Sequence, residues 1–264
     1  VTTLFALNPE GAMAGWEKSM KIQIVSFIIL MVMTTQARLI AFVWTVALSI
    51  GFFGIKGGIF TVTTGGHSLV FGPVGSFIAE NHALALATIT ILPLLYFLQQ
   101  YNTNKWIKRG LLLAILLCVF SVLGSSSRGA FLSLSAMGFF LILKSRRRLP
   151  MLLMLVILVP VAATFVPDKY WTRMQTIQTY EQDGSAMGRI NAWRFAIALS
   201  KDRPIVGGGF ETFTPGLFLR YAPVPDDHHD VHSIYFEVLG EHGYVGFTLF
   251  MLLALLSYGG AGWT

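Results

Sequence analysis

The sequence has little charge and almost no cysteine. Only 12% of its 264 residues are charged and 54% are hydrophobic, whereas an average soluble domain is about 25% charged. The mean hydropathy is +0.65, and a soluble core of this size has no room for so many apolar side chains. These values exclude a soluble enzyme and a disordered chain, and the single cysteine, Cys118, excludes a disulfide scaffold. We interpret the chain as an integral membrane protein.

Basic residues are in slight excess. Nineteen Lys and Arg against 13 Asp and Glu give a formal net charge of +6. In a soluble protein this excess would favour nucleic acid as a partner, but in a membrane protein it reflects Lys and Arg in cytoplasmic loops. We therefore expect membrane lipids and no nucleic acid as partners. The chain starts at Val1 without a visible signal peptide and ends in an apolar stretch, so we expect a fragment of a longer protein.

Seven apolar runs are long enough, or nearly so, to cross a bilayer, which takes about 20 residues. The sequence therefore predicts an all-α polytopic membrane protein with about seven transmembrane helices and a large structured loop that contains short helices. We expect transmembrane helices at 1–167, the loop at 168–243 and a further, truncated span at 244–264. The seven runs are residues 22–35, 39–55, 82–98, 107–124, 130–143, 149–166 and 244–262.

Lys and Arg gather in two loops and predict the orientation. Both loops, 99–110 and 144–148, are rich in these residues, so the positive-inside rule makes both cytoplasmic. An even number of crossings separates them, in agreement. The turn at 125–129, a loop at 56–81 and the long loop at 168–243 then face the other side. We expect a multi-pass protein of the bacterial inner membrane whose site faces the periplasm.

The long loop contains sequence signals of a fold. Helical spacing runs from Gly188 to Ala198, three consecutive glycines break it, and a second helix is predicted to start at Asp230. With Asp230 as the N-cap, His232 falls in the first helical turn. The helix dipole there disfavours the imidazolium form, so the imidazole stays neutral, as a general base requires.

Three polar segments are candidates for chemistry. The turn at 125–129 offers three serines and Arg128 to an anion, and the alternative is a plain turn whose Arg reaches lipid phosphates. The second segment carries Arg189, one helical turn from Trp193, and the alternative is a surface helix followed by a glycine loop. The third carries His232, for which hydrogen bonding within the loop is the alternative.

Two familiar kinds of site are not expected. The Asp and His residues at 226–230 are consecutive and lack the spacing that directs ligands to one metal ion. The glycines at 207–209 have neither the dinucleotide-binding nor the phosphate-loop spacing. We therefore expect no metal and no other cofactor.

Taken in order, the three segments resemble one family. Ser-x-Arg-Gly ends at Gly129, Arg189 with Trp193 is followed by Pro and Gly-Gly-Gly, and His232 is followed by Glu237 and spaced glycines at 240, 243 and 246. This pattern resembles the O-antigen ligase and polymerase superfamily of polytopic membrane glycosyltransferases. Glycine-rich stretches at 54–66 and 72–81 are similar to the O-glycosylation ligases associated with exosortase systems. The resemblance implies a GT-C-like architecture.

The resemblance also implies a reaction. Such enzymes move a glycan from an undecaprenyl-diphosphate carrier to an acceptor hydroxyl, which belongs to lipid A core, a protein or another glycan. Arg128 and Arg189 keep their charge at any working pH and suit a clamp on the leaving diphosphate. His232 is the candidate base in an inverting displacement.

Further residues are expected to bind substrate, and other functions stay open. Lys56, Arg194 and Arg220 are candidates for contacts with the carrier or the glycan. Tyr235 and Trp193 can stack on sugars, with core packing as the alternative. A polysaccharide polymerase and a transporter or flippase are the other functions considered. A transporter would carry ionisable residues within its spans, and the apolar runs hold almost none.

Overall fold

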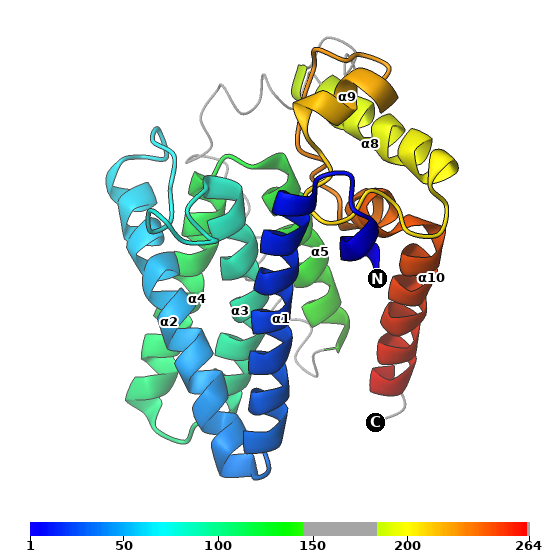
Figure 1. Cartoon of the computed structure of the whole chain (residues 1–264). Helices are drawn as coiled ribbons and strands as arrows, with labels where there is room; N and C mark the ends of the chain where they lie inside the picture. The colour runs from blue at the N-terminus through cyan, green and yellow to red at the C-terminus, as the bar shows by residue number, and fades with distance from the viewer. Residues whose placement is uncertain (145–183, 263–264) are drawn as a thin grey trace. The chain divides into compact units, whose positions relative to one another are not determined.

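The computed structural model describes residues 1–144 and 184–262, which form eight α-helices and one short 3-10 helix, with no strand among them (Figure 1). The all-α prediction is confirmed for these residues. The chain divides into two compact units. We call Val1–Val32 with Thr176–Thr264 the loop unit, and Met33–Gln175 the bundle unit.

Each unit has its own set of helices. The bundle unit contains α2 (Gln36–Thr63), α3 (Asn81–Tyr101), α4 (Lys105–Gly124) and α5 (Arg128–Lys144). The loop unit contains the 3-10 helix η1 (Thr2–Phe5), α1 (Pro9–Val32), α8 (Gly184–Asp202), α9 (Pro215–Tyr221) and α10 (Ile234–Gly262).

Among the described residues, four helices are long and apolar enough to cross a membrane: α2, α3, α4 and residues Ile234–Gly260 of α10. They correspond to four of the seven predicted spans. The predicted span at 22–35 falls mostly in α1, whose residues 9–21 include Glu10, Glu17, Lys18 and Lys21. The span at 130–143 falls in α5, where the apolar stretch is shorter. The span at 149–166 lies outside the described residues.

Glycines on one face of α2 allow it to lie directly against α4. A Cβ at Gly58 would stand 2.0 Å from the carbonyl oxygen of Leu117, and one at Gly57 would stand 2.4 Å from Oγ of Ser121. Such close approach is how small residues pack helices in membranes. Cys118 is fully buried in the same interface, as expected for a packing residue.

This packing corrects the predicted loop at 56–81. Helix α2 runs through the glycines of this stretch and ends only at Thr63. Lys56 therefore lies inside the helix, about two turns before its end. The connection that follows is held to the far end of α4. The side-chain amide of Asn81 donates to the carbonyl of Ser125 at 2.8 Å. The backbone N–H of Val70 donates to the carbonyl of Gly124 at 3.4 Å. The connection and the turn at 125–129 therefore lie at the same end of the bundle unit.

Polar side chains fix where helices of the bundle unit start. The hydroxyl of Thr35 accepts a hydrogen bond from the N–H of Arg38 and caps α2. The amide oxygen of Asn104 accepts one from the N–H of Trp106 and caps α4. N-cap residues satisfy amides that have no partner within the helix. The basic residues predicted in a loop at 99–110 therefore lie in the first turns of α4.

Candidate functional site

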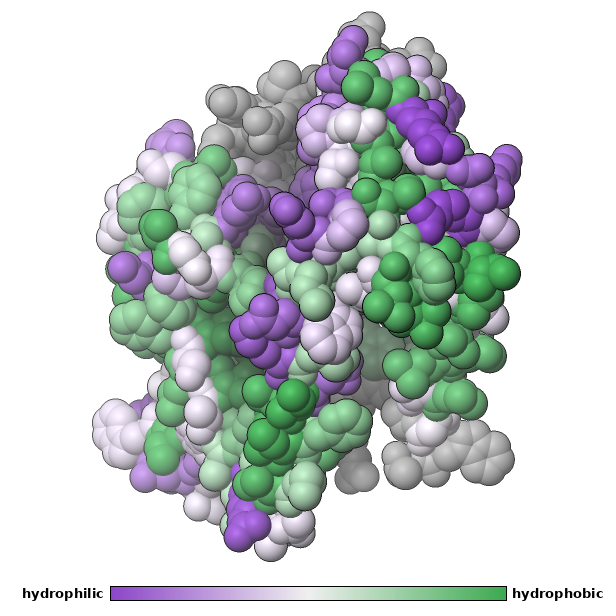
Figure 2. Space-filling model, viewed as in Figure 1, coloured by the Kyte–Doolittle hydropathy of each residue, from purple (hydrophilic) through white to green (hydrophobic). Residues whose placement is uncertain are grey.

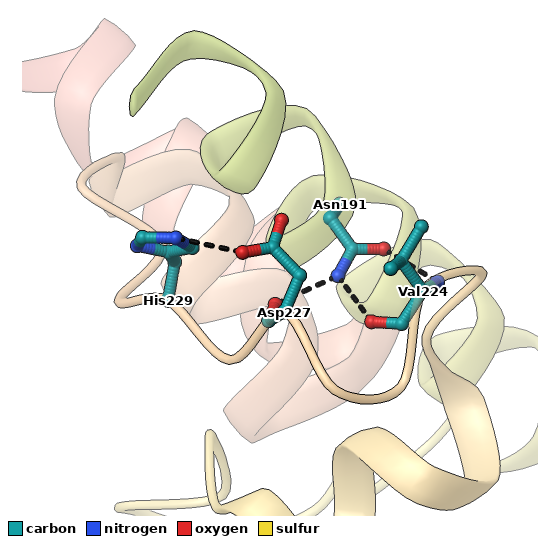
Figure 3. Close-up of polar contacts among 4 residues, drawn as sticks. All are labelled: Asn191, Val224, Asp227 and His229. Atoms are coloured by element: carbon teal, nitrogen blue, oxygen red, sulfur yellow. Dashed lines mark hydrogen bonds and ion pairs between the residues drawn. The ribbon is translucent and has the colours of Figure 1, made fainter. Parts of the chain in front are cut away.

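Asn191 on α8 holds the loop that precedes α10. Its amide nitrogen donates to the carbonyls of Val224 at 2.8 Å and Asp227 at 2.9 Å, and its oxygen accepts from the N–H of Val224 at 3.0 Å (Figure 3). Asn191 is only 4% exposed. Because one buried side chain satisfies three backbone groups, the loop is fixed against the helix.

Gly188 makes room for the same loop one turn earlier on α8. A Cβ there would stand 2.1 Å from Cδ2 of His229, so any larger residue would displace this ring. Nε2 of His229 lies 2.8 Å from Oδ1 of Asp227, as Figure 3 shows. The Gly-Arg-x-Asn-x-Trp segment of α8 thus shapes the loop at two successive points.

Trp193 makes the third contact between α8 and this loop. Its indole N–H donates to the carbonyl of Val231 at 2.9 Å, and its ring stacks on Phe236 with centroids 5.0 Å apart. Phe195 and Phe218 stack beside it in the core of the loop unit. Of the two roles considered for Trp193, core packing is the one that these contacts describe.

His232 follows directly after the carbonyl that Trp193 binds. It has φ 45°, in the left-handed region, and α10 starts two residues later at Ile234. The prediction that Asp230 caps this helix and that His232 lies in its first turn is wrong, because a residue at positive φ cannot belong to a right-handed helix. Nδ1 of His232 lies 3.8 Å from Oδ2 of Asp230, and the side chain is 43% exposed.

Arg189 lies on the same face of α8 as Trp193, which binds the segment before His232. It is exposed, and residues four apart share one side of a helix, which puts it beside Trp193 as predicted. Since Trp193 binds the carbonyl before His232, Arg189 and the His232 segment belong to the same part of the loop unit.

A sharp break divides α10. Gly243 has φ 65° and ψ −169°, a conformation that L-residues rarely adopt, and a Cβ there would stand 2.6 Å from the carbonyl oxygen of Pro204. The N–H of Tyr244 donates to this same carbonyl at 2.8 Å. The three glycines are hydrogen-bonded to the turn of α10 before the break. The N–H of Gly208 donates to the carbonyl of Gly240 at 2.9 Å, and the N–H of Gly209 donates to the carbonyl of Glu241 at 2.8 Å.

Beyond the break α10 is apolar, and before it α10 carries a buried carboxylate. Apolar side chains cover the helix after Gly243 (Figure 2). Glu241 is 8% exposed, and its Oε1 accepts the N–H of Glu211 at 2.8 Å. The neighbouring His242 has its Nδ1 3.0 Å from the hydroxyl of Thr2. The start of the chain is thereby tied to the glycine loop and to α10.

Arg128 is the first residue of α5, in the bundle unit. The serines before it hold the turn together. The buried hydroxyl of Ser125 donates to the carbonyl of Val122 at 2.6 Å, and that of Ser127 accepts the N–H of Ala130 at 3.3 Å. The hydroxyl of Ser125 thus donates to the backbone, whereas that of Ser127 acts here as an acceptor and can still donate to an anion.

The three basic residues expected to contact the carrier or the glycan lie on three different helices. Lys56 is exposed on α2, and Arg194 is exposed on α8. Arg220 on α9 lies 3.5 Å from Oδ2 of Asp202 and stacks over the ring of Tyr221. The phenol of Tyr221 donates to the same oxygen at 2.6 Å, and burial together with this hydrogen bond raises the pKa of Tyr221.

Tyr235 on α10 differs from Trp193 in its exposure. It is 55% exposed and meets Phe250 edge to face, with ring centroids 6.3 Å apart. Its ring is thus accessible to a ligand as well as packed against its neighbour.

The fold and the site define a class, which is a polytopic helical membrane protein with a folded loop unit. More than half of the chain, residues 113–251, matches the O-antigen ligase family, and the chain belongs to this family. Residues 1–103 match a family of unknown function (DUF5935). No curated protein and no solved structure matches the chain. Family membership implies ligation of a lipid-linked glycan to an acceptor, a glycosyltransferase-type activity at a membrane.

Sequence reasoning missed two groups of residues. Asn191 gave no signal beyond being a polar residue on a helix, although it lies about one turn from Gly188, which contacts the same loop. Glu241 and Glu211 interact across 30 residues, and Asn8 reaches Glu211 across 203 residues. Contacts of such long range have no local pattern in a single sequence.

Proposed function

We propose that this chain transfers a glycan from an undecaprenyl-diphosphate carrier to an acceptor hydroxyl on the periplasmic face of the bacterial inner membrane. His232 is the catalytic base, and Arg128 and Arg189 bind the diphosphate. The observation that carries this proposal is the Trp193–Val231 hydrogen bond. It ties the helix of Arg189 to the residue before His232, in a chain of the O-antigen ligase family.

The reaction is a single displacement at the anomeric carbon. The acceptor oxygen forms a bond to this carbon while His232 takes the hydroxyl proton. The bond from the same carbon to the phosphate oxygen breaks, and undecaprenyl diphosphate leaves with that electron pair. The anomeric configuration inverts.

Fixed positive charge lowers the barrier to this step, because negative charge grows on the diphosphate as it leaves. Arg128 suits this task as the first residue of α5, since the N-terminus of a helix itself favours anions. Arg189 is exposed on α8 and forms no ion pair with any residue in 1–144 or 184–262. A guanidinium cannot lose its proton at a working pH, so both clamps stay charged.

Other residues and the acceptor complete the proposal. Lys56, Arg194 and Arg220 are proposed to bind the carrier or the glycan, and Tyr235 is proposed to stack on a sugar ring. The acceptor is lipid A core or a protein hydroxyl. A polymerase that uses a glycan acceptor is the second candidate within the same superfamily.

The test is a transfer assay on the full-length protein in liposomes. It uses the host's glycan on undecaprenyl diphosphate as donor, and mass spectrometry identifies the product. We expect Arg128→Ala and Arg189→Ala each to lower the rate by about 10²–10³-fold, and His232→Ala by about 10²–10⁴-fold. Lys201→Ala, an exposed cation on α8, and His67→Ala in the α2–α3 loop are matched controls that keep normal rates. Normal rates in the three site variants would refute the assignment.

Membrane orientation is tested separately by cysteine labelling in intact cells. A cysteine at Gly184 should react with a membrane-impermeant thiol reagent, and a cysteine at Arg147 should react only after lysis. The opposite pattern would put the loop at 168–243 on the cytoplasmic side, where no undecaprenyl-linked glycan is presented to a periplasmic ligase.

A further inference from the structure

The loop unit contains an open pocket of about 350 Å³ that none of the proposed catalytic residues lines. This volume is near the lower end of the range of about 300–1,000 Å³ for small-molecule sites. One wall is the first half of α1, and the other is the turn before α9. The lining residues are Asn8, Gly11, Ala14, Gly15, Lys18, Glu211, Phe213 and Thr214.

The shape of this pocket depends on a constrained residue, Glu211. It has φ 54°, a conformation that costs a non-glycine residue free energy and persists only where its surroundings hold it. Two side chains hold its backbone. The buried carboxylate of Glu241 accepts its N–H at 2.8 Å, and the amide of Asn8 donates to its carbonyl at 3.0 Å. The carboxylate of Glu211 is exposed at the pocket.

The wall of the pocket formed by α1 has no bulky side chains at Gly11 and Gly15. A Cβ at Gly15 would stand 2.7 Å from Cβ of Phe210, and one at Gly11 would stand 3.0 Å from Cβ of Glu211. The glycines therefore let the turn before α9 come close to α1. Lys18 lies one turn beyond Gly15, at the end of the α1 wall. Asn8 keeps the geometry, because its oxygen also accepts the N–H of Gly11 at 3.3 Å.

The chemistry of the lining selects among possible ligands. A carboxylate, an ammonium, an amide and a hydroxyl offer both donors and acceptors, and Phe213 adds an aromatic ring. A prenyl chain offers neither donors nor acceptors to these polar groups. A diphosphate is disfavoured, because the exposed carboxylate of Glu211 at the pocket would repel it. The lining carries one carboxylate and one ammonium and has no net positive charge.

We propose that this pocket is a sugar-binding subsite for a neutral or amino sugar of the glycan, separate from the site of the diphosphate. It deepens the proposed function and rests on it. The pocket and His232 both belong to the loop unit. A sugar bound here lies in the unit that carries the base.

A protection experiment tests binding without requiring transfer. Cysteine replaces Ala14 in the full-length protein in liposomes, and its reaction rate with an impermeant maleimide is measured. Cys118 is fully buried and adds little background. Glu10→Cys, exposed on α1 outside the pocket, is the matched control. The probes are the host glycan on undecaprenyl diphosphate, the sugar-free carrier, the glycan released by mild acid, and the acceptor.

We expect sugar-bearing probes to slow alkylation of Ala14→Cys by about tenfold at ten times their dissociation constant, with no effect on Glu10→Cys. Protection by the donor glycan or by the acceptor alone assigns the sugar to that substrate. Equal protection by the sugar-free carrier, or no protection by any glycan, overturns the subsite. As a second measurement, Glu211→Gln should raise the KM for the protected substrate by about tenfold while kcat changes little, with Glu10→Gln as control.

The outcomes separate this inference from the proposed function. Protection that persists in His232→Ala, which we expect, shows the subsite independently of chemistry. Transfer without protection would overturn the subsite alone, and protection in a protein that transfers nothing would overturn the proposed function alone.

Discussion

Replacing Asn191 with alanine should release the loop that carries His232. The substitution removes three hydrogen bonds of 2.8–3.0 Å from a side chain that is 4% exposed. At about 1 kcal/mol for each bond, the loop loses about 3 kcal/mol of local stability. Since about 1.4 kcal/mol is a factor of ten, the open form of the loop becomes about 100 times more populated.

Hydrogen–deuterium exchange measures this opening directly. The amide of Val224, which donates to Asn191, should exchange about 100-fold faster in Asn191→Ala, and amides in α2 and α4 should not change. Asn104→Ala is the matched control, because it removes one capping bond at the start of α4 and should leave Val224 protected. Unchanged exchange at Val224, together with unchanged transfer, would refute the idea that α8 positions His232 through this loop.

Three other perturbations have equally definite outcomes. Trp193→Phe keeps an aromatic ring on Phe236 but loses the hydrogen bond to the carbonyl of Val231. Glycan transfer should therefore fall, while the thermal midpoint in detergent changes by only a few degrees. Unchanged transfer would contradict this. Gly58→Val forces a side chain into the backbone of Leu117 and should destabilise the bundle by about 1–3 kcal/mol, whereas Gly110→Ala, with open space around it, should not lower the midpoint. The phenol of Tyr221 has a raised pKa, from burial and its bond to Asp202, so its contribution to stability is present below about pH 10 and is lost as pH rises through that pKa. Tyr221→Phe should flatten this alkaline loss in a pH series of thermal midpoints, and an identical loss in the variant would exclude Tyr221 as its source.

The features that the sequence predicted well depend on local patterns. Long apolar runs identified α2, α3, α4 and the second part of α10, because hydropathy and length alone decide whether a helix can span a bilayer. The helix around Arg189 was predicted from its spacing, and the break after it from Pro204 and the three glycines. Each of these signals lies within a few residues of the element that it describes.

The features that the sequence did not predict depend on tertiary contacts. The glycines at 54–58 are typical of a loop, yet they pack α2 against α4, which is visible only once Leu117 is known to be opposite. Asp230 is a good N-cap by residue type, yet the bond from Trp193 to Val231 holds the chain so that His232 adopts φ 45°. The sugar pocket needs Asn8 to meet Glu211 across 203 residues.

We propose that Arg128, Arg189 and His232 act on the same diphosphate. A double-cysteine variant of the full-length protein, Arg128→Cys with His232→Cys, tests it with a thiol cross-linker that spans about 10 Å, roughly the range over which exposed charges act at 0.1 M salt. We expect efficient intramolecular cross-linking, with no cross-link when Arg109→Cys replaces Arg128→Cys. Absence of the 128–232 cross-link, with both cysteines reactive, would contradict it.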